Sequence, residues 1–460
     1  MSIFASRAVK DSLCYGKSLA RRLSTTPKSA GRLLLLLAAC VFLFPQAPQA
    51  SSAAKVKSEF GGYFDFPTCV RYALVHSEDF LRNRLSIQMA SADVKDAHAE
   101  LLPTVQIVTR YYLATASDQL TTPLNVQLFI TNWDPYLALL KIKSSGIMVD
   151  IGTINHYDKI SDNISQMAKI FYHIHVLDKT IRARKQIMAL HQNKVSYGQS
   201  RHEQGAVDPL EVRLWTNNMK AERVKLKSLE AEREEKIGQL KMIMGYHPDY
   251  YLPLDTRDAA NQILAGFNGQ LVTFAEIQGG NMPLKILAKK EQLQSNLVTG
   301  AYVALIPKPV FVLEDVQNQV DRTSGFNLAL GLDYTIWDGF KRVREIKRQK
   351  MKAEQLKIDR DKFSQRLYNQ FKHLRAELDL SGEREGFNRE QARLAELTEE
   401  RAFLQYKAGE IPYEHYVERR LEKVQAFVDS LSSVEGRVTS LIDLATIAGG
   451  LNKYNAGIRY

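Results

Sequence analysis

The stretch Leu330-Gly331-Leu332-Asp333-Tyr334-Thr335-Ile336-Trp337-Asp338-Gly339-Phe340 decides the fold predicted for this chain. Its first part alternates as a β-strand does, so we expect a strand that runs to Trp337. The strand ends in Trp337-Asp338-Gly339 and passes straight into a long charged helical pattern that begins near Lys341. Such a join is unusual, and the same join occurs once more, earlier in the sequence.

The earlier join follows a strand-like run at residues 126–131 and ends in Trp133-Asp134, 204 residues before Trp337-Asp338. Three other pairs of landmarks have the same separation, namely Pro103 and Pro307, Gly205 and Gly409, and Gly245 and Gly449. Four kinds of landmark on one offset without gaps indicate an internal duplication. Two units of this length leave little room for a separate catalytic domain.

Residues 1–54 have the composition of a secretory signal peptide. Basic residues precede a twelve-residue apolar run at residues 33–44, and small residues follow it, which are the three parts of such a signal. We expect cleavage between Ala50 and Ala54. Leu37-Ala38-Ala39-Cys40 also resembles a lipoprotein box, so lipidation of Cys40 is the alternative. No other run approaches the ~20 apolar residues that a transmembrane helix needs.

The rest of the chain divides into two repeats. The first, residues 55–245, contains a helix at about 68–101, a β-hairpin at 104–133 and two long helices, the first of them weakened by Gly146 and Gly152. A linker at 246–272 follows. The second repeat, residues 273–450, contains a helix broken at Asn281, a β-hairpin at 308–337 and two further long helices. Residues 451–460 form a tail.

The long helices are expected to pack lengthwise against one another. A helix over residues 341–408 would be about 100 Å long at ~1.5 Å per residue, and no single globular core covers that length. Apolar residues of the last helix recur with the 3.5-residue period of a coiled-coil seam: Val417, Leu421, Val424, Val428, Leu431 and Val438. Between them lie charged residues of both signs, which argues against a nucleic-acid-binding patch.

The strands are few and alternating, with aromatic residues near their ends, as in transmembrane β-hairpins. Four strands cannot close a barrel, and open strand edges are not tolerated in lipid. If these strands cross a membrane, several copies of the chain must share one barrel. The membrane assignment therefore requires an oligomer.

The order of these elements resembles the TolC-like outer-membrane efflux and secretion proteins. The resemblance covers residues 65–450 and rests on the Ala-rich helix before Pro103, the joins at Trp133-Asp134 and Trp337-Asp338-Gly339, and the helix breaks at Gly205 and Gly409. It implies a mainly α protein with a small transmembrane β part, in which duplicated helix-strand-strand-helix-helix units form a long coiled-coil-like α-helical barrel. This barrel joins a β-barrel shared between protomers.

The resemblance also implies a function. Such proteins are homotrimers in the outer membrane, with most of their mass in the periplasm. They are passive exit ducts of tripartite efflux pumps or type I secretion systems. Their partners are a periplasmic adaptor and an inner-membrane pump of RND or ABC type, together with outer-membrane lipid. Neither a nucleic acid nor a cofactor is implied.

The residues around the helix breaks are the candidate periplasmic tip. In the family, the breaks that match Gly205 and Gly409 are turns, and acidic residues after them ring the pore. Glu410, Glu414 and Glu418 are spaced i, i+4 and i+8, so we expect them on one helix face. The resemblance assigns Glu418 to a pore-acid position. The alternative is an ordinary solvated helix face.

Three further tip residues are carried over by position. Tyr406 matches a residue that helps hold the closed tip, and Glu211 matches its acidic partner position. His415 stands where the family has a second pore acid. Ile411 stands where the family has an arginine, so a clasp of that kind is not transferred intact.

Nothing in the sequence supports catalysis or metal binding. No nucleophile elbow, phosphate loop or HExxH motif is present, so no enzyme is predicted. His173 and His175 are two residues apart on a predicted helix and point to different faces. The competing hypothesis is a periplasmic adaptor or a coiled-coil scaffold. Adaptors have one helical hairpin flanked by β modules, whereas this chain has two hairpins with its strands between helices, which favours the duct.

Overall fold

The computed structural model describes residues 62–102, 104–110, 125–131, 134–266, 273–318 and 323–449. The predicted signal peptide with Cys40, Trp133 and the tail at 451–460 lie outside these residues. The helices and strands all belong to one compact unit, Tyr63–Tyr460. No described helix combines the length and the hydropathy of a membrane span.

Each repeat contributes two shorter helices, two strands and two long helices. The elements of the first repeat are α3 (Phe66–His76), α4 (Glu78–Ala99), β1 (Thr104–Arg110), β2 (Asn125–Thr131), α5 (Pro135–Glu203) and α6 (Pro209–Met244). After α7 (Ala259–Gly266), which lies in the predicted linker, come α8 (Phe274–Gly280), α9 (Met282–Val303), β3 (Lys308–Asn318), β4 (Thr323–Asp333), α10 (Lys341–Lys407) and α11 (Tyr413–Ile447).

The duplication is confirmed by backbone geometry at the glycines. Gly205 and Gly409, which follow α5 and α10, have φ values of 73° and 75°. Gly245 and Gly449, which follow α6 and α11, have φ values of 68° and 67°. Positive φ is the region that glycine enters without steric cost, so each glycine ends its helix for the same reason.

A second duplicated break lies at Ser77 and Asn281, again 204 residues apart. Both residues have nearly the same extended backbone, with φ and ψ of −62° and 126° at Ser77 and of −64° and 118° at Asn281. Asn281 accepts a hydrogen bond from the Leu284 amide and donates one to the Ile447 carbonyl. The break at Asn281 is as predicted. The single helix expected over residues 68–101 is wrong, because Ser77 interrupts it without a glycine or proline.

The expectation that Gly146 and Gly152 weaken the first long helix is also wrong. α5 continues through both for 69 residues. A glycine inside a helix costs only about 1 kcal/mol relative to alanine. Packing of α5 against its neighbours along its whole length outweighs that cost.

The strand expected to run to Trp337 is shorter than predicted. β4 ends at Asp333 rather than at Trp337, and α10 starts only at Lys341. Gly339 and Phe340 both have positive φ, 65° and 62°, which turns the chain before the helix begins. β3, in contrast, extends through the acidic residues that follow Leu313 and ends at Asn318, paired in register with β4.

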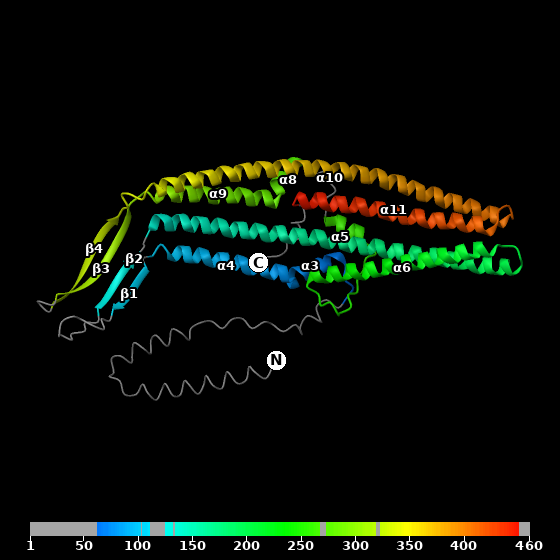
Figure 1. Cartoon of the computed structure of the whole chain (residues 1–460), viewed down its shortest axis with the longest axis horizontal. Helices are drawn as coiled ribbons and strands as arrows, with labels where there is room; N and C mark the ends of the chain where they lie inside the picture. The colour runs from blue at the N-terminus through cyan, green and yellow to red at the C-terminus, as the bar shows by residue number, and fades with distance from the viewer. Residues whose placement is uncertain are drawn as a thin grey trace, which may run out of the picture. The chain divides into compact units, whose positions relative to one another are not determined.

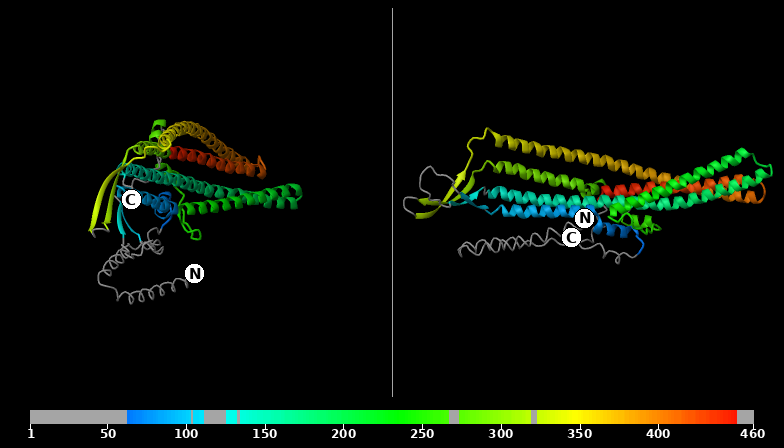
Figure 2. Two further views of the ribbon diagram at one scale, coloured as in Figure 1. Left: turned by 60° about the vertical axis from the view of Figure 1, so that its left-hand side comes forward. Right: turned by 60° about the horizontal axis from the view of Figure 1, so that its bottom comes forward.

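The four strands form one antiparallel sheet in the order β1-β2-β3-β4. The helices follow the same order. α5 packs against α4 and α9 in the half near the sheet and against α6 and α11 in the other half, and α10 packs against α9 and then α11. The sheet and the two turns of the long hairpins lie at opposite ends of the helices (Figures 1 and 2). One chain is therefore a wall one helix thick, continuous with its sheet.

Candidate functional site

The two turns at Gly205 and Gly409 form the tip of the helical part. In the first turn, the Asp208 side chain accepts a hydrogen bond from the Leu210 amide at 2.8 Å and caps α6. In the second, Pro412 precedes α11 with an extended backbone. Both turns lie at the same end in every view (Figure 2).

The structure separates the three glutamates that the spacing placed on one face. Glu410 lies in the turn, before α11 begins at Tyr413, so only Glu414 and Glu418 occupy the helix. The expectation of a shared face is wrong for Glu410, because the left-handed Gly409 and the extended Pro412 interrupt the helical spacing.

Glu418 has a partner that the sequence did not suggest. Its carboxylate accepts a hydrogen bond from the Lys194 ammonium of α5 at 3.1 Å. The Lys194 side chain is only 8% exposed, whereas that of Glu418 is 53% exposed. The ammonium also lies 5.0 Å from the centre of the Trp215 ring of α6, a cation–π arrangement. His415 lies within 3.7 Å of the same carboxylate.

Trp215 packs closely against Gly198. A Cβ atom at position 198 would lie 2.3 Å from the Trp215 ring, so only glycine fits there. The contact brings α5 and α6 together next to Lys194. In the sequence, the one sign of this contact is a glycine inside a predicted helix. A glycine alone does not indicate which residue packs against it, so Trp215 could not be predicted.

Tyrosines surround the second turn. The rings of Tyr406 and Tyr416 are stacked with centres 5.5 Å apart, and Tyr413 lies between them and Tyr197 of α5, 4.8 Å from the latter. Burial, assisted by the neighbouring tyrosines, raises the pKa of Tyr413. Ile411 packs against this cluster. Tyr406 thus contributes an aromatic contact at the tip.

Glu211 does not meet Tyr406. It lies exposed in the first turn of α6, where its charge favours the positive end of the helix dipole. Among the described contacts, no hydrogen bond or ion pair joins its side chain to α10 or α11. The structure therefore does not bring Tyr406 and Glu211 together.

The strand-to-helix joins share a capping aspartate. Asp134 accepts a hydrogen bond from the Leu137 amide at 3.0 Å, and Asp338 accepts from the Lys341 and Arg342 amides. Lys308 of β3 lies 3.5 Å from Asp134, which links the two repeats.

The second join also carries an exposed aromatic pair. Trp337 is 72% exposed and packs edge-to-face against Phe340 with ring centres 4.9 Å apart. Ile336 beside them is 89% exposed. Large apolar side chains with this exposure mark a surface that meets another molecule or a lipid.

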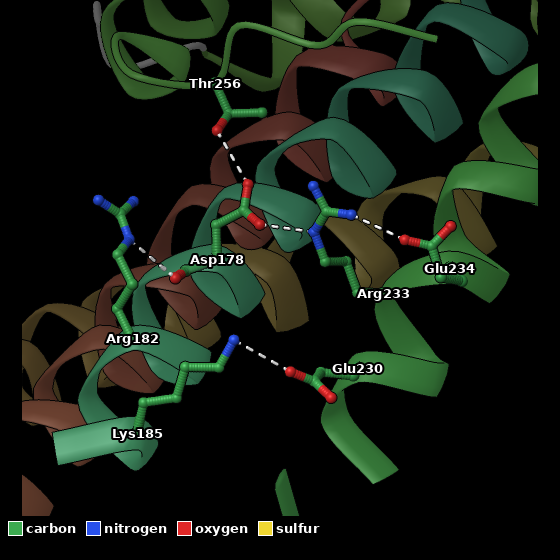
Figure 3. Close-up of polar contacts among 7 residues, drawn as sticks. All are labelled: Asp178, Arg182, Lys185, Glu230, Arg233, Glu234 and Thr256. Atoms are coloured by element: carbon green, nitrogen blue, oxygen red, sulfur yellow. Dashed lines mark hydrogen bonds and ion pairs between the residues drawn. The ribbon is translucent and has the colours of Figure 1, made fainter. Parts of the chain in front are cut away.

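A polar network joins α5 and α6 farther from the tip (Figure 3). Arg233 donates a hydrogen bond to Asp178 at 2.6 Å, and Thr256 donates to the other oxygen of Asp178. Lys185 pairs with Glu230 at 3.1 Å, about two turns from Asp178 along α5 and one turn from Arg233 along α6. Thr256 lies in the segment between the repeats, so this network also fastens that segment to the first hairpin.

No protein-family model and no curated protein sequence matches the chain. Solved structures match it over most of its length. The open-state MtrE outer-membrane channel of Neisseria gonorrhoeae superimposes with a TM-score of 0.70 at 14% identity, covering 84% of this chain and 89% of that one. The CmeC outer-membrane channel of Campylobacter jejuni gives a TM-score of 0.65 at 13% identity, covering 84% and 85%.

A membrane protein from Pseudomonas aeruginosa gives a TM-score of 0.68 at 13% identity and covers 88% of this chain and 95% of that one. Identities this low establish the fold alone. The chain has the fold of the TolC-like outer-membrane channels, with their long helical part, so the predicted fold class is confirmed. The β-barrel shared between protomers stays a prediction.

Proposed function

We propose that this chain is an outer-membrane exit duct that passively conducts substrates delivered by an inner-membrane transporter. The observation that carries the proposal is the single sheet whose outer strands, β1 and β4, have no further neighbour among the described residues and which continues into a wall one helix thick. Such a wall has two open edges and becomes a tube when copies close into a ring. MtrE and CmeC, which share this fold, are outer-membrane channels.

The ring of the proposed duct has three copies. β4 of one copy pairs with β1 of the next, which gives twelve strands and leaves no open edge. The same closure brings α10 against the neighbour's α4. Both helices carry exposed apolar residues in the half near the sheet: Leu81, Leu85 and Met89 on α4, and Val343, Met351 and Ile358 on α10.

The levels of these two apolar stripes agree. Met89 and Met351 each lie ten residues from the end of their helix that adjoins the sheet. At ~1.5 Å per residue both lie about 15 Å from the end of their helix that adjoins the sheet. The stripes would therefore meet at the same height when strands of neighbouring copies pair.

At the narrow end of the proposed duct, Glu414 and Glu418 line the pore with Glu410 and His415 beside them. Lys194 and the tyrosines around Tyr406 hold the hairpins of the two repeats together there. A periplasmic adaptor docks at this end and joins the duct to a pump of RND or ABC type. The proposed mature chain begins after residue 54, with repeats at 55–245 and 273–450.

Membrane fractionation tests the proposal directly. A duct is extracted from the outer membrane as a trimer that resists dissociation in SDS until heated, and it forms channels in planar bilayers. The adaptor and coiled-coil scaffold alternatives predict a soluble periplasmic protein without channel activity. Recovery of a soluble monomer would rule out the duct.

A disulfide between copies tests the ring. The double variant Met89→Cys, Met351→Cys is expected to form covalent dimers and trimers on oxidation. In the proposed ring, α4 of one copy places position 89 opposite position 351 on α10 of the next copy. Met89→Cys with Met242→Cys is the matched control, since Met242 is also exposed but lies at the far end of α6. Equal crosslinking of both pairs would contradict the arrangement.

A further inference from the structure

His173 of α5 lies between α6 and α11, about three turns before the ends of these two helices. Its Nε2 atom lies 2.9 Å from a carboxylate oxygen of Glu232 on α6, and its Nδ1 atom contacts a carboxylate oxygen of Glu435 on α11. The ring is about a quarter exposed. One side chain of α5 therefore contacts an acid from its own repeat and an acid from the other.

The protonation state follows from this geometry. A carboxylate only accepts hydrogen bonds, so each ring nitrogen needs a hydrogen to donate. A neutral imidazole carries one such hydrogen, and the imidazolium carries two. Only the protonated ring satisfies both contacts, and removing the proton sets a lone pair against one of the two acids.

We propose that His173 is a proton-dependent tie that fastens α6 and α11 to α5 when protonated and releases one of them when neutral. The hairpin of the first repeat and α11 of the second are then coupled more tightly at acidic pH. The inference goes beyond conduction, since it concerns how two repeats of one chain hold together. It does not depend on what passes through the duct.

The charged groups around the His173 ring come from three neighbouring helices. The two carboxylates that face the ring are Glu232 and Glu435, and the hydrogen bond to Glu435, followed by burial in the opposite sense and then by Glu232, leaves the pKa of His173 raised. The fourth helix, α10, contributes Glu385 nearby, but this acid is held by Arg389 and Arg437.

Two further groups belong to the same level. Lys169, one turn earlier on α5, pairs with Asp443 of α11. Tyr172 is buried next to the ring, and burial with the charges of Glu435 and Glu385 raises its pKa to about 12, so it stays neutral throughout the relevant range. Tyr172 therefore does not contribute a change of charge at this level.

The tie has no counterpart in the second repeat. The position 204 residues after His173 is Glu377, which is half-exposed on α10 and lies 3.9 Å from His373 of the same helix. The second repeat therefore has the matching helix without this contact.

The direction of the pH effect follows from the raised pKa. Stabilisation by the tie is complete below the unfolded-state pKa of about 6.5 and is lost as the pH rises through the higher folded-state value. His156, His175 and His191 on the same helix have lowered pKa values, chiefly through burial, and act in the opposite direction. The pH dependence of global stability therefore combines opposite effects, and the test must measure the distance between α6 and α11 directly.

The test uses the full chain purified in detergent, with Cys69→Ala and spin labels at Ala231→Cys on α6 and Ser432→Cys on α11, diluted among unlabelled copies. Both labelled positions are exposed and lie next to the tie. We expect a narrow distance distribution at pH 5.5 that broadens on raising the pH, with a midpoint above 6.5. Hydrogen exchange at the histidine C2 positions gives the pKa of His173 in the same samples.

Three variants decide the outcome. His173→Gln should abolish the pH dependence, and Glu435→Gln should lower both the midpoint and the pKa of His173. His175→Gln, two residues away, is the control and should leave both unchanged. A transition that persists in His173→Gln, a pKa of His173 at or below that of exposed His373, or a distance that does not respond to pH would overturn the proposal. If His173→Gln does not fold, the Glu435→Gln variant alone tests the proposal.

Discussion

Lys194 and Glu418 join the two repeats near the tip through a hydrogen bond of 3.1 Å between α5 and α11. The two ends of this pair differ in environment, because the lysine is buried and the glutamate is half-exposed. Removing the glutamate leaves a buried ammonium without its carboxylate, whereas removing the lysine leaves an acid that water can solvate. The consequences of the two substitutions are therefore unequal.

Glu418→Ala should destabilise the protein more than Lys194→Met. We expect the loss for Lys194→Met to be about 1 kcal/mol or less, since a half-exposed pair contributes little, and the loss for Glu418→Ala to exceed it. Denaturant unfolding of the two variants measures the difference. Glu422→Ala is the control, because its pair with Arg419 is exposed at both ends. Equal losses in both variants would contradict the burial of the ammonium.

Neutralising the acids of α11 should change ion selectivity. The double variant Glu414→Gln, Glu418→Gln is expected to lower the preference for cations in planar-bilayer recordings, because two negative charges leave the proposed pore in every copy. Asp249→Asn, in the exposed segment after α6, serves as the control, because it removes a negative charge away from α11. Selectivity and conductance equal to those of the wild type would show that these residues do not line the pore.

Gly198→Ala should destabilise the contact between α5 and α6. The added Cβ would lie 2.3 Å from the Trp215 ring, and overpacking of this kind costs about 1–3 kcal/mol. Gly146→Ala in the same helix has open space around it and should be neutral or stabilising by up to about 1 kcal/mol. Thermal unfolding of the pair tests this. A stabilised Gly198→Ala variant would be incompatible with the packing described.

Gly280 and Gly279 offer a comparison between neighbours. A Cβ at Gly280 would lie 2.1 Å from the Ala448 carbonyl oxygen, while nothing lies within 4 Å of one at Gly279. Backbone atoms cannot move aside as a side chain can, so Gly280→Ala should separate the end of α11 from α8, whereas Gly279→Ala should be tolerated. Protease sensitivity of residues 440–449 reports the separation. Identical digestion patterns for the two variants would argue against the close approach.

Acid should weaken the protein through His175. Burial, followed by the charge of Lys179, lowers the pKa of this histidine. Its neutral form is favoured in the folded state, so its contribution to stability is present above pH ~6.5 and is lost as the pH falls through the folded-state pKa. His175→Asn should reduce the loss of thermal stability between pH 7 and pH 5. A pH dependence of thermal stability equal to that of the wild type would contradict this role of His175.

The features that the sequence predicted correctly are those with a local cause. Gly205 and Gly409 end helices because glycine adopts positive φ, and Asp134 and Asp338 begin them by capping amides. Because the same helix-ending and helix-starting residues recur 204 residues apart, the order of helices and strands could be predicted. The order of the helices then follows from the order of the strands.

The features that the sequence did not predict depend on contacts between distant residues. Ser77 breaks a helix where the local signal is only a serine followed by Glu78 and Asp79, and α5 continues through Gly146 because its neighbours support it. Lys194 and Glu418 are 224 residues apart, and no pattern in either helix points to the other. β4 ends at Asp333, before Trp337, because its partner strand β3 begins at Lys308, the residue that pairs with Asp333.

The breaks at Ser77 and Asn281 also have a mechanical consequence. α5 and α10 run without interruption from the sheet to the tip, while the helices beside them are divided in two at one level. A force applied along the axis at the tip passes to the sheet through two unbroken rods, which makes each wall stiff against compression. Torsion meets less resistance at the level of the two breaks. A twisting movement of the tip half would therefore be concentrated at that level and leave the strands in register.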